Sequence, residues 1–466
     1  MTLASELGAL DGLATAQAIR DGEVSAQEVA EAAVSRCRST DRQLNAIAAD
    51  AYDTFALPDD PAAPFFGVPI VIKDNDAWPG LPTRQGSRAT SPAPAAGPSG
   101  FAADLAALGF VVVGTSTMPE FGITASTEST LYGATRNPWN PDRTAGGSSG
   151  GSAALVAGGA LPMAHANDGG GSIRIPASCT GLVGLKSSRD RFTPADGTEN
   201  MPVNVVVQGM LSRTVRDTAH AYHALAQLRG NPQLPPLPLV AGPGSRRLRI
   251  GYYTMALGGL EPDQPTRNTL ERAAATLAGA GHDVTRIANP YDDQLGKDFL
   301  RYWAVLCWAL KNGGKAVHGP GFDRSQVGLL VSSMARMAVS QLPKVPGSMR
   351  RLQRHSAGHG QPFGDYDVLL SPVLGHEPPP LGYLGPEVEF RDQLIRLLRW
   401  ANHTALANVS GVPAISLPGG FGRAGVPIGI QLTGPVGSEE MMLELAYEWE
   451  ALSPWPLSTA DHDPAA

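Results

Sequence analysis

Apolar and polar positions alternate with helical spacing at the start of the chain. Apolar residues recur every three or four positions through residues 4–38, which predicts two helices. Ser25 and Glu28 have the spacing of a capping box at the start of the second helix. Acidic residues interrupt each apolar run, so we expect no secretory signal here. We expect residues 1–60 to form a helical segment that packs on the outside of the protein.

Short apolar stretches rich in β-branched residues alternate with helical stretches after this segment. Residues 67–72 form one such strand and end at Lys73, and residues 110–113 form another after a helix at 100–108. This alternation is typical of a mainly parallel sheet covered by helices. We therefore expect residues 61–466 to fold as a single α/β/α domain around a large mixed, mostly parallel sheet, with the N-terminal helices packed on it.

A proline-rich connection at residues 231–247 divides this expected domain into two halves. Strands at 248–253 and 282–287, with a helix at 265–280 between them, resume the same order beyond the connection. No apolar stretch approaches the length of about 18 residues that a membrane-spanning helix needs. We therefore expect neither a membrane span nor a membrane partner.

The composition indicates a compact protein with an unusual amount of glycine and proline. The 466 residues include 54 Gly and 40 Pro, and only 17% are charged, against about 25% in an average globular protein. The formal net charge of −7 argues against a nucleic-acid partner, because such surfaces carry a basic patch. The three cysteines have neither disulfide nor zinc-site spacing, which favours a reducing cytoplasm. The histidines also show no ligand spacing, so we expect no metal.

Two clusters, at residues 143–152 and 168–174, combine glycines with hydroxyl-bearing residues. Runs of glycine let backbone N–H groups converge on one point, as an anion-binding loop or an oxyanion hole requires. Apolar strand-like stretches surround both clusters, which disfavours a flexible linker. These clusters are therefore the candidate catalytic region.

Two generic interpretations of the clusters are open on the residues alone. Residues 146–150 match G-x-S-x-G, the nucleophile elbow of α/β-hydrolases, but residues 137–142 form a turn-rich loop where the elbow needs a strand. Phosphate binding is disfavoured, because neither G-x-x-x-x-G-K-[ST] nor G-x-G-x-x-G occurs between a strand and a helix. Neither interpretation accounts for both clusters.

Five motifs in order along the chain resemble the amidase signature family. They are residues 67–75, 118–122, 137–141, the glycine and serine block at 143–174, and 181–186. The resemblance extends from about residue 20 to about residue 452.

The resemblance implies a catalytic triad of Lys73, Ser148 and Ser172. Ser172 would be the nucleophile, Ser148 the bridging serine with a cis peptide bond from Gly147, and Lys73 the base. The chemistry is plausible on physical grounds, because an alcohol is a poor nucleophile near neutral pH and needs a base within hydrogen-bond reach. A lysine can be that base when burial favours its neutral form.

The resemblance also implies an oxyanion hole at the second cluster. Its donors would be the backbone N–H groups of Gly169, Gly170, Gly171 and Ser172. Family members usually have a larger residue where this chain has Gly169, and this departure would widen the hole without removing a donor. Asp168 and Arg174 bracket the loop, and we expect them to hold it rather than to contact substrate.

Substrate contacts are harder to assign from the sequence. Tyr302, Trp303 and Cys307 lie in an aromatic-rich stretch of the later half, where the family's specificity tends to be set. We take these three residues as candidate substrate contacts, with core packing as the alternative.

The function that the resemblance implies is hydrolysis of a carbon–nitrogen acyl bond through an acyl-enzyme, with no metal or organic cofactor. Residues 165–178 are especially similar to the branch that includes hydrolases of cyclic nylon oligomers, such as the cyclic dimer of 6-aminohexanoate. This similarity points to a small-molecule amide, anilide, lactam or carbamate (urethane), and a homodimer is compatible with it. The alternative is the glutaminase subunit of a tRNA-dependent amidotransferase, which would have the same triad and obligate protein partners. A membrane lipid amidase is disfavoured by the lack of a hydrophobic anchor.

Overall fold

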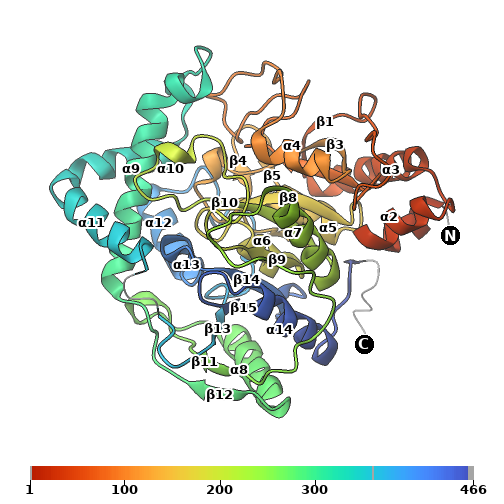
Figure 1. Ribbon diagram of the computed structural model, residues 1–466. Helices are drawn as coiled ribbons and strands as arrows, with labels where there is room; N and C mark the ends of the chain where they lie inside the picture. Colours follow the sequence, from red (N-terminus) through yellow and green to blue (C-terminus); the bar gives the residue numbers. More distant parts are fainter. Residues whose placement is uncertain (1–2, 359–361, 460–466) are drawn as a thin grey trace.

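An eight-stranded sheet lies at the centre of the computed structural model, which describes residues 3–358 and 362–459 (Figure 1). The strand order is β12-β11-β13-β15-β14-β9-β10-β8. The strands are β8 (Met163–Asp168), β9 (Val183–Lys186), β10 (Val207–Ser212), β11 (Arg249–Tyr252), β12 (Asp283–Arg286), β13 (Val368–Pro372), β14 (Ala414–Phe421) and β15 (Pro427–Thr433). The large mixed sheet expected from the sequence is confirmed.

The expectation that this sheet is mostly parallel is wrong. Only the pairs β11–β12 and β11–β13 are parallel, and the remaining neighbours run antiparallel. Helix α6 joins β8 to β9, which therefore run in the same direction, but β10 lies between them in the sheet. Strands β14 and β15 pair directly as an antiparallel hairpin. Strands β8 and β9, which are joined by a helix, thus run in the same direction but are not neighbours in the sheet.

A smaller sheet of three strands lies beside the large one and contains most of the first motif, residues 67–75. Its strands are β1 (Ile47–Asp50), β2 (Pro69–Lys73) and β3 (Val111–Ser116), in the order β1-β3-β2. The backbone N–H of Lys73 donates to Nδ1 of His165 on β8 over 3.1 Å, which ties β2 to the edge of the large sheet. Two short hairpins complete the strands: β4 (Glu128–Ser129) with β5 (Gly133–Ala134), and β6 (Arg136–Asn137) with β7 (Asn140–Thr144).

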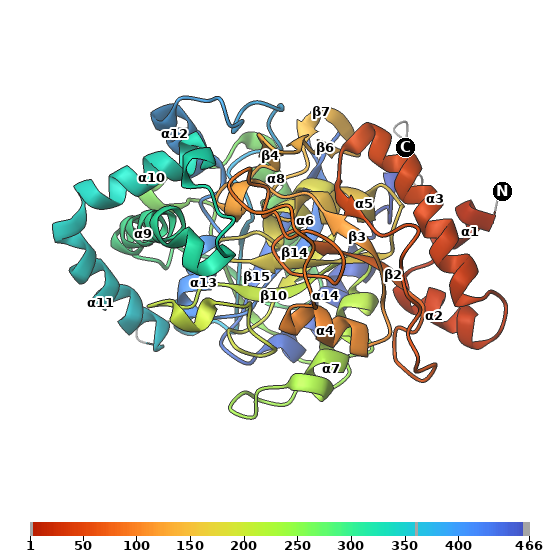
Figure 2. The same ribbon diagram turned by 90° about the horizontal axis from the view of Figure 1, so that it is seen from above.

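Helices surround the sheets, and two groups of them lie at opposite sides of the protein in Figure 2. One group is α1 (Leu3–Ala9), α2 (Gly12–Arg20) and α3 (Ala26–Leu44), and the other is α9 (Asp293–His318), α10 (Leu329–Ser340) and α11 (Val345–Ser356). The other helices are α4 (Gly100–Ala107), α5 (Gly150–Ala157), α6 (Arg174–Thr180), α7 (Val215–Arg229), α8 (Gln264–Gly279), α12 (Phe390–Trp400), α13 (Ala405–Ser410) and α14 (Glu439–Leu452). None of the helices within the described ranges combines the length and apolarity needed to cross a lipid bilayer.

The N-terminal segment contains three helices where the apolar spacing predicted two. Asp11 caps α2, because its side chain accepts a hydrogen bond from the backbone N–H of Ala14 over 2.8 Å and so starts a new helix. The capping box at the start of α3 is confirmed: Ser25 and Glu28 each accept a hydrogen bond from the other's backbone N–H.

The main apolar core joins strands from both sides of the proline-rich connection. Buried side chains of this core include Ile70, Leu185, Ile250, Leu370 and Ile430. Leu237 and Val240, which belong to the connection itself, are buried in the same core. Burial of apolar surface from distant segments therefore fixes the strand ends that carry the motifs.

Candidate active site

Lys73 is the last residue of β2, and its side chain is completely buried. Its Nζ atom lies 2.7 Å from Oγ of Ser148 and 2.6 Å from Oδ1 of Asn167. Burial lowers the pKa of Lys73 to about 7, although the nearby carboxylates of Asp76 and Asp168 act to raise it. A large fraction of this amine is therefore neutral near pH 7, as a proton acceptor must be.

Ser148 lies in the loop between β7 and α5, and the Gly147–Ser148 peptide bond is cis. Glycines leave room for this loop against its neighbours. A Cβ atom at Gly147 would lie 2.9 Å from the backbone carbon of Ala125, and a Cβ at Gly122 would lie 3.1 Å from Oγ of Ser148. The first of these glycines belongs to the Gly/Ser block and the second to the motif at 118–122, so two motifs separated in sequence shape one loop.

Ser172 lies just before α6, in the loop that follows β8. Its side chain lines a cavity, and within the described ranges its hydroxyl has no hydrogen-bond partner. Ser148 is held by Lys73, whereas the Ser172 hydroxyl is free to meet a ligand in the cavity. The structure therefore places the two serines in different environments: Ser148 is hydrogen-bonded to the buried amine, and Ser172 faces the cavity.

Asp168 fixes the glycine loop, residues 169–173, through hydrogen bonds to its backbone. Its carboxylate accepts hydrogen bonds from the backbone N–H groups of Gly171, over 2.7 Å, and Ile173, over 3.1 Å. The expectation of four oxyanion donors is therefore wrong for Gly171, because Asp168 already takes its N–H. Within the described ranges, the N–H groups of Gly169, Gly170 and Ser172 have no such partner.

Arg174 neutralises Asp168 in the protein interior. Both side chains are fully buried, and Nη2 of Arg174 lies 2.9 Å from Oδ1 of Asp168. Burial alone would raise the pKa of Asp168, but the guanidinium group and its hydrogen bonds outweigh that effect and lower the pKa well below its usual range. Arg174 also donates to the side chains of Gln431 and Asn408, so the loop is anchored to β15 and α13. Both residues hold the loop, as expected.

The cavity in front of Ser172 has a volume of about 420 Å³ and a predominantly apolar wall. Its apolar lining comes from the residues Ile123, Ala125, Ile175, Leu257, Leu260, Phe299, Leu300, Trp303, Leu397, Leu398, Ala401, Ala405 and Leu406. Among the described residues of this wall, the only ionic side chains are Asp293 and Lys297, in the first two turns of α9. The site therefore offers a ligand mainly apolar contact.

Helix α9 presents one face to this cavity, formed by Gly296, Phe299, Leu300 and Trp303. The rings of Phe299 and Trp303 stack with their centroids 5.3 Å apart. A Cβ atom at Gly169 would lie 3.5 Å from Cη2 of Trp303, an ordinary van der Waals distance, so the indole lies directly against the glycine loop. We call the stacked pair Phe299 and Trp303 the aromatic shelf.

Of the three candidate substrate contacts on α9, the structure brings only Trp303 to the cavity. Trp303 lines the cavity, but Tyr302 is buried elsewhere and its hydroxyl donates to the carbonyl of Val203 over 2.6 Å. Cys307 does not line the cavity; it is buried in the apolar cluster behind Trp303, where burial raises the pKa of its thiol. The spacing of three and four residues along α9 would have identified Phe299 and Leu300 as the cavity-facing neighbours of Trp303.

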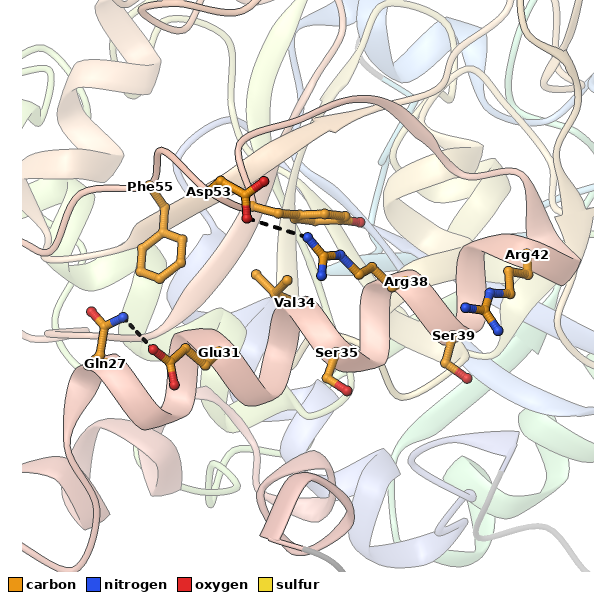
Figure 3. A pocket seen from close by; sticks show the side chains of 10 residues that line it. Gln27, Glu31, Val34, Ser35, Arg38, Ser39, Arg42, Asp53 and Phe55 are labelled. Carbon is orange, nitrogen blue, oxygen red and sulfur yellow. Dashed lines mark hydrogen bonds and ion pairs between the residues drawn. The ribbon is translucent and has the colours of Figure 1, made fainter.

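A second depression, on the N-terminal helix α3, has none of this chemistry. Figure 3 shows its lining, in which Arg38 pairs with Asp53 over 3.5 Å and Gln27 donates to Glu31. Asp53 is 89% exposed, so water screens this ion pair. In the described part of the chain, no three or more His, Cys, Asp or Glu side chains group so as to hold a metal ion.

Comparison with known proteins gives consistent matches over nearly the whole chain. The family model described as Amidase matches residues 25–443. AmiC of Mycobacterium leprae is 42% identical over 96% of this chain and 96% of its own length. The 6-aminohexanoate-cyclic-dimer hydrolase of Pseudomonas sp. (strain NK87) is 32% identical over 96% of this chain and 95% of its own length. A solved structure of 6-aminohexanoate cyclic dimer hydrolase superposes with a TM-score of 0.83 and 29% identity, covering 97% of this chain and 98% of that one.

The buried pair of Asp168 and Arg174 gives a stability prediction. Replacing Asp168→Asn leaves a buried guanidinium group without its counter-charge, and we expect the free energy of unfolding to fall by about 3–5 kcal/mol. Urea unfolding followed by circular dichroism measures this difference.

The matched control is Asp53→Asn, which removes the exposed partner of Arg38 and is expected to change the free energy of unfolding by less than about 1 kcal/mol. Equal losses in the two variants would contradict the role assigned to Asp168.

Proposed function

The chain belongs to the amidase signature family, a family of hydrolases of non-peptide C–N bonds, and we propose that it cleaves a small apolar amide through an acyl-enzyme on Ser172. One observation carries this proposal. A fully buried lysine lies 2.7 Å from Ser148, and Ser172 faces an apolar cavity nearby.

In the proposed reaction, Oγ of Ser172 attacks the carbonyl carbon of the amide. Its proton passes to Ser148, which gives its own proton to the neutral amine of Lys73. The tetrahedral intermediate collapses when the C–N bond breaks, and the same relay returns the proton to the leaving nitrogen. Water then attacks the Ser172 ester by the same path and releases the acid. The depressed pKa of Lys73 supports this role, because proton transfer is efficient when the pKa of the base lies near the working pH.

We propose that the oxyanion is stabilised by the backbone N–H groups of Gly169, Gly170 and Ser172. The anchoring of their loop by Asp168 supports this assignment, because donors that are fixed before the reaction need no reorganisation during it. An oxyanion donor of this kind contributes about 3–4 kcal/mol to transition-state stabilisation.

The substrate class that the cavity favours is an amide, lactam, anilide or carbamate with an apolar body. The aromatic shelf and the leucines of α12 offer contact to such a body on two sides. The similarity to hydrolases of the 6-aminohexanoate cyclic dimer supports the same class, since that substrate consists mainly of methylene groups joined by two amides.

Glutamine fits this cavity poorly. Its α-amino and α-carboxylate groups would need charged partners, whereas the charges among the described lining residues are confined to Asp293 and Lys297. Both lie in the first two turns of α9, whereas the rest of the described lining is apolar or uncharged. The glutaminase subunit is therefore the less favoured function.

The nucleophile assignment predicts the effect of Ser172→Ala. We expect this substitution to lower the turnover of an apolar anilide by about 10⁴-fold or more, as loss of a nucleophile does in other serine hydrolases. A fluorophosphonate should label Ser172 in the wild-type protein, and mass spectrometry of the digested protein identifies the labelled serine. Labelling of Ser148 instead would contradict the assignment.

The aromatic shelf predicts a second effect, on substrate choice. We expect Trp303→Ala to lower kcat/KM for an aryl anilide by about 10- to 100-fold, because an aromatic contact of this size contributes about 1.5–3 kcal/mol. Acetamide, which does not reach the shelf, should lose much less.

Trp308→Ala is the matched control for that experiment. Trp308 lies on the same helix but is 47% exposed, and it is outside the cavity wall. A wild-type preference for glutamine over every apolar amide, or equal effects of the two tryptophan variants, would contradict the proposed substrate class.

A further inference from the structure

Two oxygen atoms contact the buried amine of Lys73. One belongs to the hydroxyl of Ser148, at 2.7 Å, and the other to the side-chain amide of Asn167, at 2.6 Å. No third hydrogen-bond partner of Nζ occurs in the described part of the chain. The triad explains the contact with Ser148, but it gives no role to Asn167.

The two oxygens have different chemistry. The amide oxygen of Asn167 can only accept, whereas the hydroxyl of Ser148 can donate or accept. A neutral amine has two N–H bonds and one lone pair. An N–H of Lys73 must therefore point at Asn167, and the lone pair is left free to face Ser148, the group from which it takes the proton. With Ser148 alone, an N–H could point at the hydroxyl and the lone pair would face away from it.

We infer that Asn167 is a positioning residue, which accepts a hydrogen bond from the Lys73 amine and thereby turns its lone pair toward Ser148. The inference rests on the proposed function of the triad and assigns a role to a residue outside it.

The fold holds Asn167 firmly enough for this role. It lies in β8, opposite Gln208 of β10 in an antiparallel pair, and its side chain is buried. The hydroxyl of Ser149, the residue after the bridging serine, donates to the backbone carbonyl of Asn167 over 3.3 Å. The backbone that carries the side-chain amide is thus fixed from its own strand and from the loop that carries Ser148.

Other ionisable groups near Lys73 are already engaged. Asp76 accepts hydrogen bonds from Ser99 and Gln208, and Asp168 is paired with Arg174. His165, on β8, accepts from the backbone of Lys73, and burial lowers the pKa of its ring.

The remaining elements that pack on β2 add little charge near the amine. Neither β3 nor α5 carries an ionisable side chain. The charged residues of α3 lie at or near the surface, its buried thiol is Cys37, and Arg36 donates to the carbonyl of Ala160. A change at position 167 is therefore the most direct way to alter the protonation of Lys73 without touching the triad.

The test measures how kcat/KM for a chromogenic anilide depends on pH in Asn167→Asp and Asn167→Ala. Activity needs neutral Lys73, so it should rise with pH through the pKa of the amine, near 7 in the wild type. A carboxylate at position 167 stabilises the ammonium form, and we expect the acidic limb of the profile to move up by about 1–3 pH units. Removal of the acceptor in Asn167→Ala should lower kcat by about 10- to 100-fold and move the limb the other way.

If Asn167 had a purely structural role, the acidic limb would not move to higher pH in Asn167→Asp and to lower pH in Asn167→Ala. Ser152→Ala is the matched control, since Ser152 is buried beside the site and bonds to Ser116 and His165 without contacting Lys73. Its acidic limb should stay at the wild-type pH. Asn167→Asp has nearly the same shape as the wild-type residue and keeps an oxygen acceptor for Lys73, so its kcat above the shifted limb should stay near the wild-type value. A large loss of kcat there would contradict the positioning role even if Asn167→Ala does not fold.

An unchanged limb in Asn167→Asp would overturn the inference. Covalent labelling separates this outcome from a failure of the proposed function. If a fluorophosphonate labels Ser172 in the wild type but the acidic limb of the pH profile is the same in Asn167→Asp, only the role of Asn167 is wrong. If Ser172 is not labelled at all, the triad itself is wrong.

Discussion

Burial of a single amine is the constraint on which the site depends. Lys73 ends a fully buried strand, so its charged form loses the solvation it would have in water, and its pKa falls to about 7. The apolar strand that places Lys73 there therefore also favours the neutral form of its amine. The nearby carboxylates of Asp76 and Asp168 limit this effect, and Arg174 in turn neutralises the second of them. The pKa of Lys73 therefore depends on Asp76, Asp168 and Arg174, which are buried and do not line the cavity.

The abundance of glycine has a concrete explanation in this site. Glycines of two distant motifs surround Ser148 at distances where a Cβ atom would collide with its neighbours. In the further run of three at 169–171, Gly170 lines the cavity, and a Cβ atom at Gly171 would collide with the side chain of Thr404. Asp168 fixes the loop by accepting hydrogen bonds from the N–H groups of Gly171 and Ile173. The hydrogen bonds that make the loop rigid therefore occupy N–H groups that could otherwise bind a ligand.

Local features were predictable from the sequence, and features that depend on distant partners were not. The strand ending at Lys73 and the capping box at Ser25 follow from neighbouring residues, and both are confirmed. The direction of strand pairs was predicted wrongly, because apolar spacing does not reveal that β10 lies between β8 and β9. Tyr302 and Cys307 were expected at the cavity, but Tyr302 lies on another face of α9, and Cys307 lies one turn beyond Trp303, past the cavity wall. Asn167 was missed because nothing in its local sequence signals that it meets a lysine of another strand.

The central claim is that Lys73 is neutral near physiological pH, and direct titration tests it best. The protein can be prepared with ¹³C-labelled lysine, and the signal of Lys73 identified by its loss in Lys73→Met. The shift of its Cε resonance with pH then reports the pKa of the amine. We expect a midpoint near pH 7. A midpoint near 10.5, the ordinary value for lysine, would contradict it.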